Sequence, residues 1–402
     1  MGNSRVKIVA VGLGNRTCKY LQYVADHPEL AELVAIADTD SSRFPKVMEK
    51  FGLPENSCFE SLDSLIGSGA EADACIIGTP DTCHHEMALK AMRAGWHVLL
   101  EKPMAQNLAE CQDIVRVSQE TGKLVSICYV LRYHPYFINL KELSHSPSTG
   151  RILSVRQTER VGKDRTTHTF VRGPWNLKEM NTTVFFTKCC HDVDFVLWII
   201  GEDIRSVRSA RGSKMFEDKD APADSAERCI NCPIENDCQY SAFDLYYRRR
   251  DWVKGFSSHP GETQDDTIKR ILETSRYGRC VYRCPDNGVV EFQKVTFETS
   301  DGVTADITME CNTDESERIT VIECQNAVIS GNERTIEVSY KDGTPSESYD
   351  FTWAKSMKLH AGADMLIIRE FIDAIRNGNL ATRSTCASAL KSHEICFNAE
   401  LQ

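Results

Sequence analysis

Short apolar runs alternate with amphipathic segments over the N-terminal third of the chain, and this alternation limits the fold more than any other feature. The segments between the runs carry apolar residues at helical spacing, and two of them are expected to end at Gly95 and Gly122. Alternating units of this length build a parallel, doubly wound α/β sheet. The expected strands are Val6–Val11, Glu32–Ala37, Ala74–Gly78, His97–Leu100 and Leu124–Tyr129.

The turn after the first run is Gly12-Leu13-Gly14, followed by Asn15 and Arg16. A nucleotide pyrophosphate needs backbone amides at a helix N-terminus and a close approach of the main chain, which is why glycine is wanted in such a turn. Thr17 replaces the third glycine of the usual motif. These residues predict a Rossmann domain that binds a dinucleotide.

Asp38 stands at the end of the second run. A carboxylate there accepts hydrogen bonds from both ribose hydroxyls and favours NAD over NADP. A helix-capping role is the alternative, and Ser41, Ser42 and Arg43 offer a site for a 2′-phosphate. We therefore expect NAD or NADP, with NAD favoured.

Two residues suit hydride transfer from an alcohol, which needs a group that takes the hydroxyl proton. Lys102 lies in Glu101-Lys102-Pro103, just past the carboxyl end of a strand, where open α/β sheets bind ligands. His191 follows Lys188 by three residues on a predicted helix, so both share one helix face. An exposed lysine and a core histidine are the alternatives.

The loop at 168–176 mixes aromatic, cationic and amide side chains. Trp175 offers an apolar face to a sugar ring, while Arg172 and Asn176 offer hydrogen bonds to its hydroxyls. Ordinary core packing is the alternative for the aromatic residues.

Several motifs together resemble the Gfo/Idh/MocA oxidoreductase family along nearly the whole chain. The resemblance implies a Rossmann domain followed by an α+β domain with an open, mainly antiparallel sheet that often forms the oligomer contact, here a homo-oligomer such as a dimer or tetramer. It also implies that Lys102 is the catalytic lysine and His191 the active-site histidine. The similar elements are the glycine turn, Thr79-Pro80-Asp81-Thr82-Cys83-His84, Ala94-Gly95-Trp96-His97-Val98 leading into Glu101-Lys102-Pro103, Arg132-Tyr133, and the helix of His191.

The same resemblance gives roles to further residues. It places Thr79, Pro80, His84 and Glu101 around the cofactor, together with Lys102. We assign the substrate site to Arg132, Tyr133, Thr187 and Lys188, with the loop residues Arg172, Trp175 and Asn176.

One departure from the family pattern concerns the residue four positions before His191. Many dehydrogenases of the family carry Asp there, whereas this chain has Thr187, followed by Lys188. The Gly-Gly pair usual before that helix is also lost, with Thr182 and Thr183 nearby. The pocket is then expected to be more cationic than usual, which favours an acidic or unusual substrate.

The chain divides into an expected Rossmann domain at 1–131 and an α+β domain at 132–402, with an insertion at about 211–288. Strand-like runs recur from Val289 to Tyr340 and are expected to form an antiparallel meander, and the helix from Asp364 is expected to be the last.

Seventeen cysteines occur in the chain. Cys229, Cys232 and Cys238 lie within the insertion, followed by Cys280 and Cys284. Cys229, Cys232, Cys238 and Cys280 supply the four thiolates of a tetrahedral structural zinc site. Reduced buried cysteines, a disulfide or an iron–sulfur site are the alternatives.

Composition excludes some classes of partner. The net charge is −11 and no long basic cluster is present, so a nucleic acid would be repelled. No apolar stretch reaches the roughly 20 residues that span a bilayer, and no signal-peptide pattern is found, so a cytoplasmic location is expected and no membrane partner.

The first functional hypothesis is an NAD(P)-dependent oxidoreductase that acts on a secondary hydroxyl of a sugar, sugar derivative or cyclitol. A second is a glycoside-cleaving enzyme that uses transient hydride transfer to bound NAD. A third is a sensor that binds a dinucleotide or a sugar and has no catalytic activity.

Overall fold

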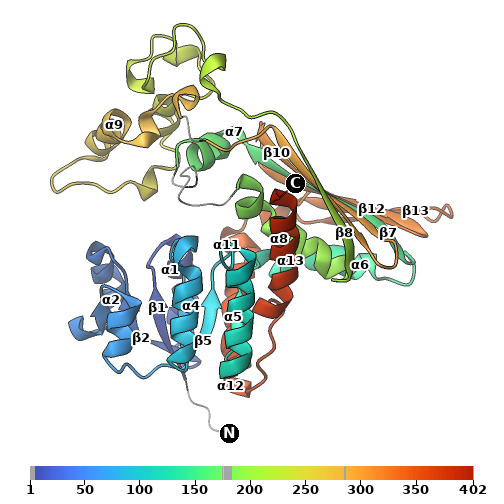
Figure 1. Cartoon of the computed structure of the whole chain (residues 1–402), viewed down its shortest axis with the longest axis horizontal. Helices are drawn as coiled ribbons and strands as arrows, with labels where there is room; N and C mark the ends of the chain where they lie inside the picture. Colours follow the sequence, from blue (N-terminus) through green and yellow to red (C-terminus); the bar gives the residue numbers. More distant parts are fainter. Residues whose placement is uncertain (1–4, 174, 176–182, 285–286, 402) are drawn as a thin grey trace.

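The computed structural model describes residues 5–173, 175, 183–284 and 287–401. Figure 1 shows two sheets, one in the blue N-terminal half and a longer, strongly twisted one beside it, with the 211–288 insertion extending beyond both. The two sheets are six-stranded and eight-stranded.

The N-terminal sheet has the strand order β3-β2-β1-β4-β5-β6, and all of its pairings are parallel. Strand β4 is buried along its whole length and β5 everywhere except at His97, because helices cover both faces. The elements are β1 (Val6–Val11), α1 (Asn15–Asp26), β2 (Ala31–Ala37), α2 (Phe44–Phe51), β3 (Cys58–Phe59), α3 (Leu62–Gly67), β4 (Ala74–Ile77), α4 (His84–Arg93), β5 (His97–Leu100), α5 (Leu108–Thr121) and β6 (Val125–Ile127).

The second sheet has the order β14-β13-β12-β11-β7-β10-β9-β8 and is antiparallel except for the β7–β10 pair. The expected fold class, a Rossmann sheet followed by an α+β domain with a mainly antiparallel sheet, is therefore confirmed. The elements are α6 (Pro135–Ser144), β7 (Ile152–Gly162), α7 (Lys163–Arg165), α8 (Val184–Ile200), β8 (Ile204–Arg211), α9 (Gln264–Thr274), β9 (Phe292–Thr299), β10 (Thr304–Thr313), β11 (Glu317–Cys324), β12 (Ala327–Gly331), β13 (Thr335–Tyr340), β14 (Glu347–Asp350), α10 (Thr352–Ser356), α11 (Lys358–Ala361), α12 (Ala363–Asn377) and α13 (Cys386–Glu400).

The expected simple meander after Val289 is wrong in one respect. Strand β7, which comes much earlier in the chain, lies between β10 and β11 and separates them. The alternation of buried and exposed residues along β7 is that of a sheet strand, but its Arg-Gln-Thr-Glu-Arg sequence is polar enough to hide this pattern.

The C-terminal helices return to the N-terminal sheet. Helix α12 packs against α1, and a further helix, α13, follows it and packs against both α5 and α8 (Figure 1). The expectation that the helix from Asp364 is the last is therefore wrong. Because α13 contacts both halves of the chain, the two sheets share one continuous apolar core.

Within the described part of the chain, no helix is both long and apolar enough to cross a membrane.

Candidate active site

The glycine turn has the backbone that a dinucleotide site needs. Gly12 has φ +77°, and a Cβ there would lie 2.8 Å from the Thr79 side chain, so only glycine fits. Gly14 caps α1 with no side-chain hydrogen bond, which leaves the first amides of the helix for a ligand. A Cβ on Gly14 would make only an ordinary van der Waals contact, so the turn itself does not require glycine at this position. Glycine there instead allows a ligand to approach the main chain.

Thr17, which replaces the third glycine, has a partner that makes room for it. A Cβ on Gly78, at the end of β4, would lie 2.1 Å from the Thr17 hydroxyl. The third glycine of the motif normally allows a helix and a strand to pack closely. Here the glycine is Gly78, directly after strand β4, rather than a residue of helix α1, and it allows the same close packing of helix and strand.

Asp38 is buried at the end of β2 beside this turn. Its carboxylate accepts hydrogen bonds from the backbone amides of Leu13 at 2.6 Å and Asp40 at 2.8 Å. Arg43 lies 3.2 Å from the same carboxylate. The carboxylate is therefore fixed beside the glycine turn by these protein contacts.

The segment before Lys102 is held from the Rossmann side. Glu101 accepts hydrogen bonds from Arg16 and Tyr20, both at 2.7 Å. Burial alone would raise the pKa of Glu101, but Arg16, Tyr20 and Lys102 outweigh burial and lower it. Arg16 also donates to Asp364 of α12 at 2.7 Å, and one of its terminal nitrogens is buried with no hydrogen-bond partner in the part of the chain that the structure describes.

His84 and His393 hold the residues after Lys102. The Nδ1 of His84 lies 2.7 Å from the Pro103 carbonyl, and its Nε2 lies 3.1 Å from the Thr79 carbonyl. The Met104 amide donates to Nε2 of His393 at 2.8 Å. His84 therefore ties two loops together through backbone atoms, and its contact with a cofactor would be indirect.

Lys102 reaches across to the second half of the chain. Its Nζ donates to the carbonyl of Thr187 at 3.0 Å, one helical turn before His191 on α8. Its charge, together with burial, lowers the pKa of His191 well below the ordinary value. The Nδ1 of His191 is buried without a hydrogen-bond partner among the described residues. Lys102, just past the carboxyl end of β5, thus reaches the helix that carries the neutral imidazole of His191.

Lys188 does not add free positive charge to this site. Its Nζ lies 2.6 Å from Glu159 of β7, and Arg318 of β11 bridges Glu159 and Asp192 at 2.8 and 2.9 Å. Burial raises the pKa of Glu159 and lowers that of Lys188. The carboxylates compensate the two cations, so the structure does not support the expectation of an unusually cationic pocket.

Arg132 and Tyr133 are not placed to bind a substrate. Arg132 is buried and forms a two-point ion pair with Asp194 at 2.7 and 2.8 Å. Tyr133 is also buried and donates its hydroxyl hydrogen to Glu370. Both assignments to the substrate site are corrected, because the polar atoms of these side chains already bind protein groups.

Arg172 is likewise misassigned to the substrate site. It is 1% exposed and donates to the carbonyls of Arg279 at 2.8 Å and Tyr240 at 2.6 Å. The same guanidinium lies 3.7 Å from the Cys229 sulfur. Trp175 is 40% exposed, and Asn176 lies outside the described residues.

The predicted zinc ligands come from three segments that Arg172 joins. Arg172 contacts the sulfur of Cys229 and the carbonyls of Arg279 and Tyr240. Arg279 directly precedes Cys280, and Tyr240 lies two residues after Cys238. Cys232 follows by a turn in which its amide donates to the Cys229 carbonyl. Over the residues that the structure describes, however, no three Cys, His, Asp or Glu side chains are grouped so that they hold a metal ion.

No role was predicted from the sequence for the residues that reach this site from the C-terminal helices, although His393 was a histidine that could reach the cleft. Asp364 and His393 hold Arg16 and Met104 from α12 and α13. His393 lies 289 residues from Met104, and no local pattern indicates a contact over such a separation.

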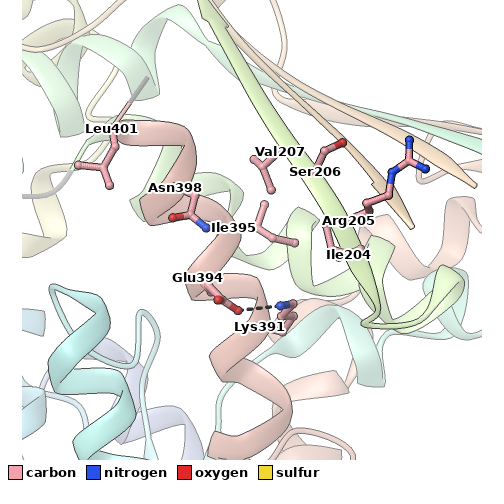
Figure 2. A pocket seen from close by; sticks show the side chains of 9 residues that line it. All are labelled: Ile204, Arg205, Ser206, Val207, Lys391, Glu394, Ile395, Asn398 and Leu401. Carbon is pink, nitrogen blue, oxygen red and sulfur yellow. Dashed lines mark hydrogen bonds and ion pairs between the residues drawn. The ribbon is translucent and has the colours of Figure 1, made fainter. Parts of the chain in front are cut away.

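An open cavity of about 410 Å³ lies between β8 and α13, apart from these residues. Figure 2 shows its lining, including Arg205, Ser206 and Asn398, with Lys391 paired to Glu394. None of the residues predicted for the active site lines it.

Residues 6–129 match the model of an oxidoreductase family with an NAD-binding Rossmann fold, Gfo/Idh/MocA. The N-terminal part of the chain is therefore similar to the NAD-binding domain of this family. The inositol 2-dehydrogenase of Salmonella typhimurium is 25% identical over 205 residues, which cover 50% of this chain and 57% of that enzyme. The inositol 2-dehydrogenase of Rubrobacter xylanophilus is 28% identical over 51% of this chain and 55% of its own length. The chain thus matches little more than half the length of these curated relatives.

Solved Gfo/Idh/MocA-like structures share the fold over the whole chain. The UDP-N-acetylglucosamine 3-dehydrogenase GnnA of Acidithiobacillus ferrooxidans is similar with a TM-score of 0.67 and 16% identity, covering 99% of this chain and 97% of that one. The WlbA dehydrogenase of Chromobacterium violaceum, solved with NADH and UDP-GlcNAcA, has a TM-score of 0.69 and 17% identity, covering 100% and 94%. At these identities the likeness shows the fold.

Proposed function

We propose that this chain is an NAD(P)-dependent oxidoreductase that acts on a secondary hydroxyl of a sugar, sugar derivative or cyclitol. The observation that carries the proposal is the hydrogen bond from Lys102 to the carbonyl of Thr187, on the helix that carries His191, while Arg16 after the glycine turn holds the neighbouring Glu101. The family of the N-terminal domain and the inositol 2-dehydrogenases among its relatives agree with this chemistry.

The residues present fit a dinucleotide. The amides at the start of α1 and the space that the glycines leave would hold the pyrophosphate, and Asp38 would bind the ribose of the adenosine. The unpartnered nitrogen of Arg16 offers a further donor to the phosphates. When bound, the dinucleotide would supply the acceptor for the hydride that leaves the substrate carbon.

In its unprotonated form, the amine of Lys102 takes the proton of the substrate hydroxyl as the carbonyl forms. The carbonyl of Thr187 accepts a hydrogen bond from this amine. The backbone on either side of Lys102 is held through Glu101 and Met104. The base is therefore oriented before the substrate binds. His191 remains neutral because burial lowers its pKa, and it orients the substrate by a hydrogen bond. In the reducing direction the same groups return the proton.

We infer a preference for NAD over NADP from Asp38. A fixed carboxylate binds ribose hydroxyls and repels a 2′-phosphate, whereas Arg43 beside it is already paired with Asp38 and Asp40.

Activity assays with NAD⁺ and NADP⁺ against a panel of cyclitols, free sugars and nucleotide sugars test the proposal. We expect one class of substrate to give NADH or NADPH, and Lys102→Ala to lose roughly 10²–10⁴-fold in kcat while it still binds the cofactor. The control is Lys219→Ala, an exposed lysine in the insertion. Full turnover by Lys102→Ala, or release of a leaving group from a nitrophenyl glycoside without net reduced cofactor, would overturn the proposal.

We also propose that Cys229, Cys232, Cys238 and Cys280 bind a structural zinc ion. Arg172 supports this, because it is a buried cation that no carboxylate pairs with among the described residues, and its partner sulfur belongs to Cys229. A zinc ion with four thiolates carries net negative charge that a buried guanidinium stabilises. Cys232 and Cys238 are only partly buried, so they have room to turn inward when the ion binds.

A further inference from the structure

Helix α8 begins at a hydroxyl that the end of another helix holds. Thr183 caps α8, and its hydroxyl accepts a hydrogen bond from the Phe186 amide at 3.1 Å. The same hydroxyl donates to the carboxylate of Glu400, the last residue of α13, at 2.6 Å. Because a hydroxyl has one hydrogen, the bond to Glu400 turns its lone pairs toward the Phe186 amide. The start of α8 is therefore oriented from the C-terminal helix, which runs beside it (Figure 1).

Glu400 is itself held by the edge of the second sheet. Arg211, at the end of β8, forms an ion pair with its carboxylate and donates to its backbone carbonyl at 3.2 Å. Gln293 of β9, which is buried, donates at 3.2 Å to the same carboxylate oxygen that accepts from Thr183. The Glu400 side chain is 16% exposed. Its carboxylate therefore joins α13, β8 and β9 to the first turn of α8.

A carboxylate suits this place in the fold. The first turn of a helix has unpaired amides and partial positive charge, which an acidic group stabilises. The first turn of α8 contains no acidic residue of its own. Glu400, 217 residues away along the chain, supplies the negative charge through the cap at Thr183.

The turn that Glu400 holds also carries the acceptor of the Lys102 amine. The Thr187 amide donates to the Thr183 carbonyl at 3.0 Å, and the Thr187 carbonyl accepts from Nζ of Lys102 at 3.0 Å. Hydrogen bonds and one turn of helix thus connect the Glu400 carboxylate with the amine. If the cap moves, the Thr187 carbonyl moves with it, and the amine loses its orientation.

We propose that Glu400 is a positioning residue of this active site. Through the cap at Thr183 it fixes the Thr187 carbonyl, which aims the Lys102 amine at the substrate hydroxyl. The proposal rests on the proposed function. Glu400 acts on the rate through geometry alone, because a base displaced by about 1 Å can lose about 10²-fold in rate.

Glu400→Ala and Thr183→Ala each remove one end of the hydrogen bond, and Thr183→Ala leaves the pair of Glu400 with Arg211 in place. The assay uses the full-length protein, its cofactor and the substrate found in the activity panel. We expect each variant to lose about 10-fold in kcat, with KM and cofactor affinity changed less than about threefold. The double variant should lose about as much as either single one, because both act through one hydrogen bond. Glu400→Gln keeps an oxygen that accepts from Thr183 and should retain kcat within about threefold.

A role in positioning is separated from a role in stability by adding Lys102→Ala. In that background Glu400→Ala should lower the remaining kcat less than about twofold, because no amine is left to aim. An equal loss of kcat in both backgrounds would show that Glu400 does not act through Lys102, and it would overturn the proposal. A normal kcat for both Glu400→Ala and Thr183→Ala would do the same.

The matched control is Glu394→Ala, which removes a carboxylate of the same helix that pairs with Lys391 and should keep the normal kcat. If Lys102→Ala itself kept its activity, the proposed function would fail. Loss of activity in Lys102→Ala together with a normal kcat for Glu400→Ala and Thr183→Ala would overturn only the positioning role.

Discussion

At the scale of single residues, Asp38 has two tasks. Its carboxylate fixes the glycine turn through the Leu13 amide, and the same oxygens lie where an adenosine ribose would bind. Asparagine keeps the shape and one acceptor oxygen of this side chain but removes its charge. The substitution therefore separates the structural task from the electrostatic one.

Asp38→Asn should weaken NAD binding by about tenfold. A hydrogen bond to a charged acceptor contributes roughly 1.5–3 kcal/mol, and part of this free energy is lost with the charge. Binding of NADP should improve, since the variant no longer repels a 2′-phosphate and Arg43 is freed from its pair. Fluorescence titration of both cofactors measures the two affinities. Asp40→Asn, a half-exposed neighbour, is the control, and an unchanged ratio of the two affinities in Asp38→Asn would contradict the prediction.

At the scale of elements, local patterns predicted what local interactions decide. The five expected strands up to Tyr129 follow from hydrophobic periodicity, and helix ends follow from glycines such as Gly122 with φ +64° at the end of α5. The two-residue edge strand β3 was not expected, because it is too short to show a period. The place of β7 between β10 and β11 could not be predicted, because strand order depends on pairing between distant segments. The same reason hides the ion pairs of Arg132 with Asp194 and of Lys188 with Glu159, since nothing near either cation in the sequence indicates its partner.

The insertion supplies a prediction at this scale, because it has only a small core of its own around Leu245 and Leu272. Purified protein should contain about one zinc ion per chain, and Cys229→Ser or Cys280→Ser should lose the ion and lower Tm by more than about 5 °C. Elemental analysis and thermal unfolding with and without a chelator measure both effects. Cys58→Ser, in the Rossmann half, should change neither. Metal-free protein with an unchanged Tm would rule out the zinc site.

At the scale of the whole molecule, Asp364 joins α12 to the glycine turn through Arg16, and its titration should affect global stability. A carboxyl with a folded pKa of about 2, against an ordinary 3.8, stabilises the fold above pH 4 and loses this effect as the pH falls through its folded pKa. The full effect is about 2 kcal/mol, and about half of it should disappear between pH 6 and pH 3.

Between pH 6 and pH 3 the free energy of unfolding should therefore fall by about 1 kcal/mol less in Asp364→Asn than in the unchanged protein. Urea unfolding at the two pH values gives the comparison. Asp373→Asn, a partly exposed residue on the same helix, should behave like the unchanged protein. Equal losses for Asp364→Asn and the unchanged protein would show that the pair with Arg16 does not stabilise the folded state.

The return of α12 and α13 has a consequence for how such a protein can be divided. A fragment that ends at residue 131 would contain every glycine of the nucleotide turn and the lysine itself, yet it would lack the carboxylate behind Arg16 and the imidazole that holds the Met104 amide. The N-terminal third is thus incomplete as a separate unit. Transplanting it onto another substrate domain would preserve its chemistry only if the last 40 residues were carried along with it.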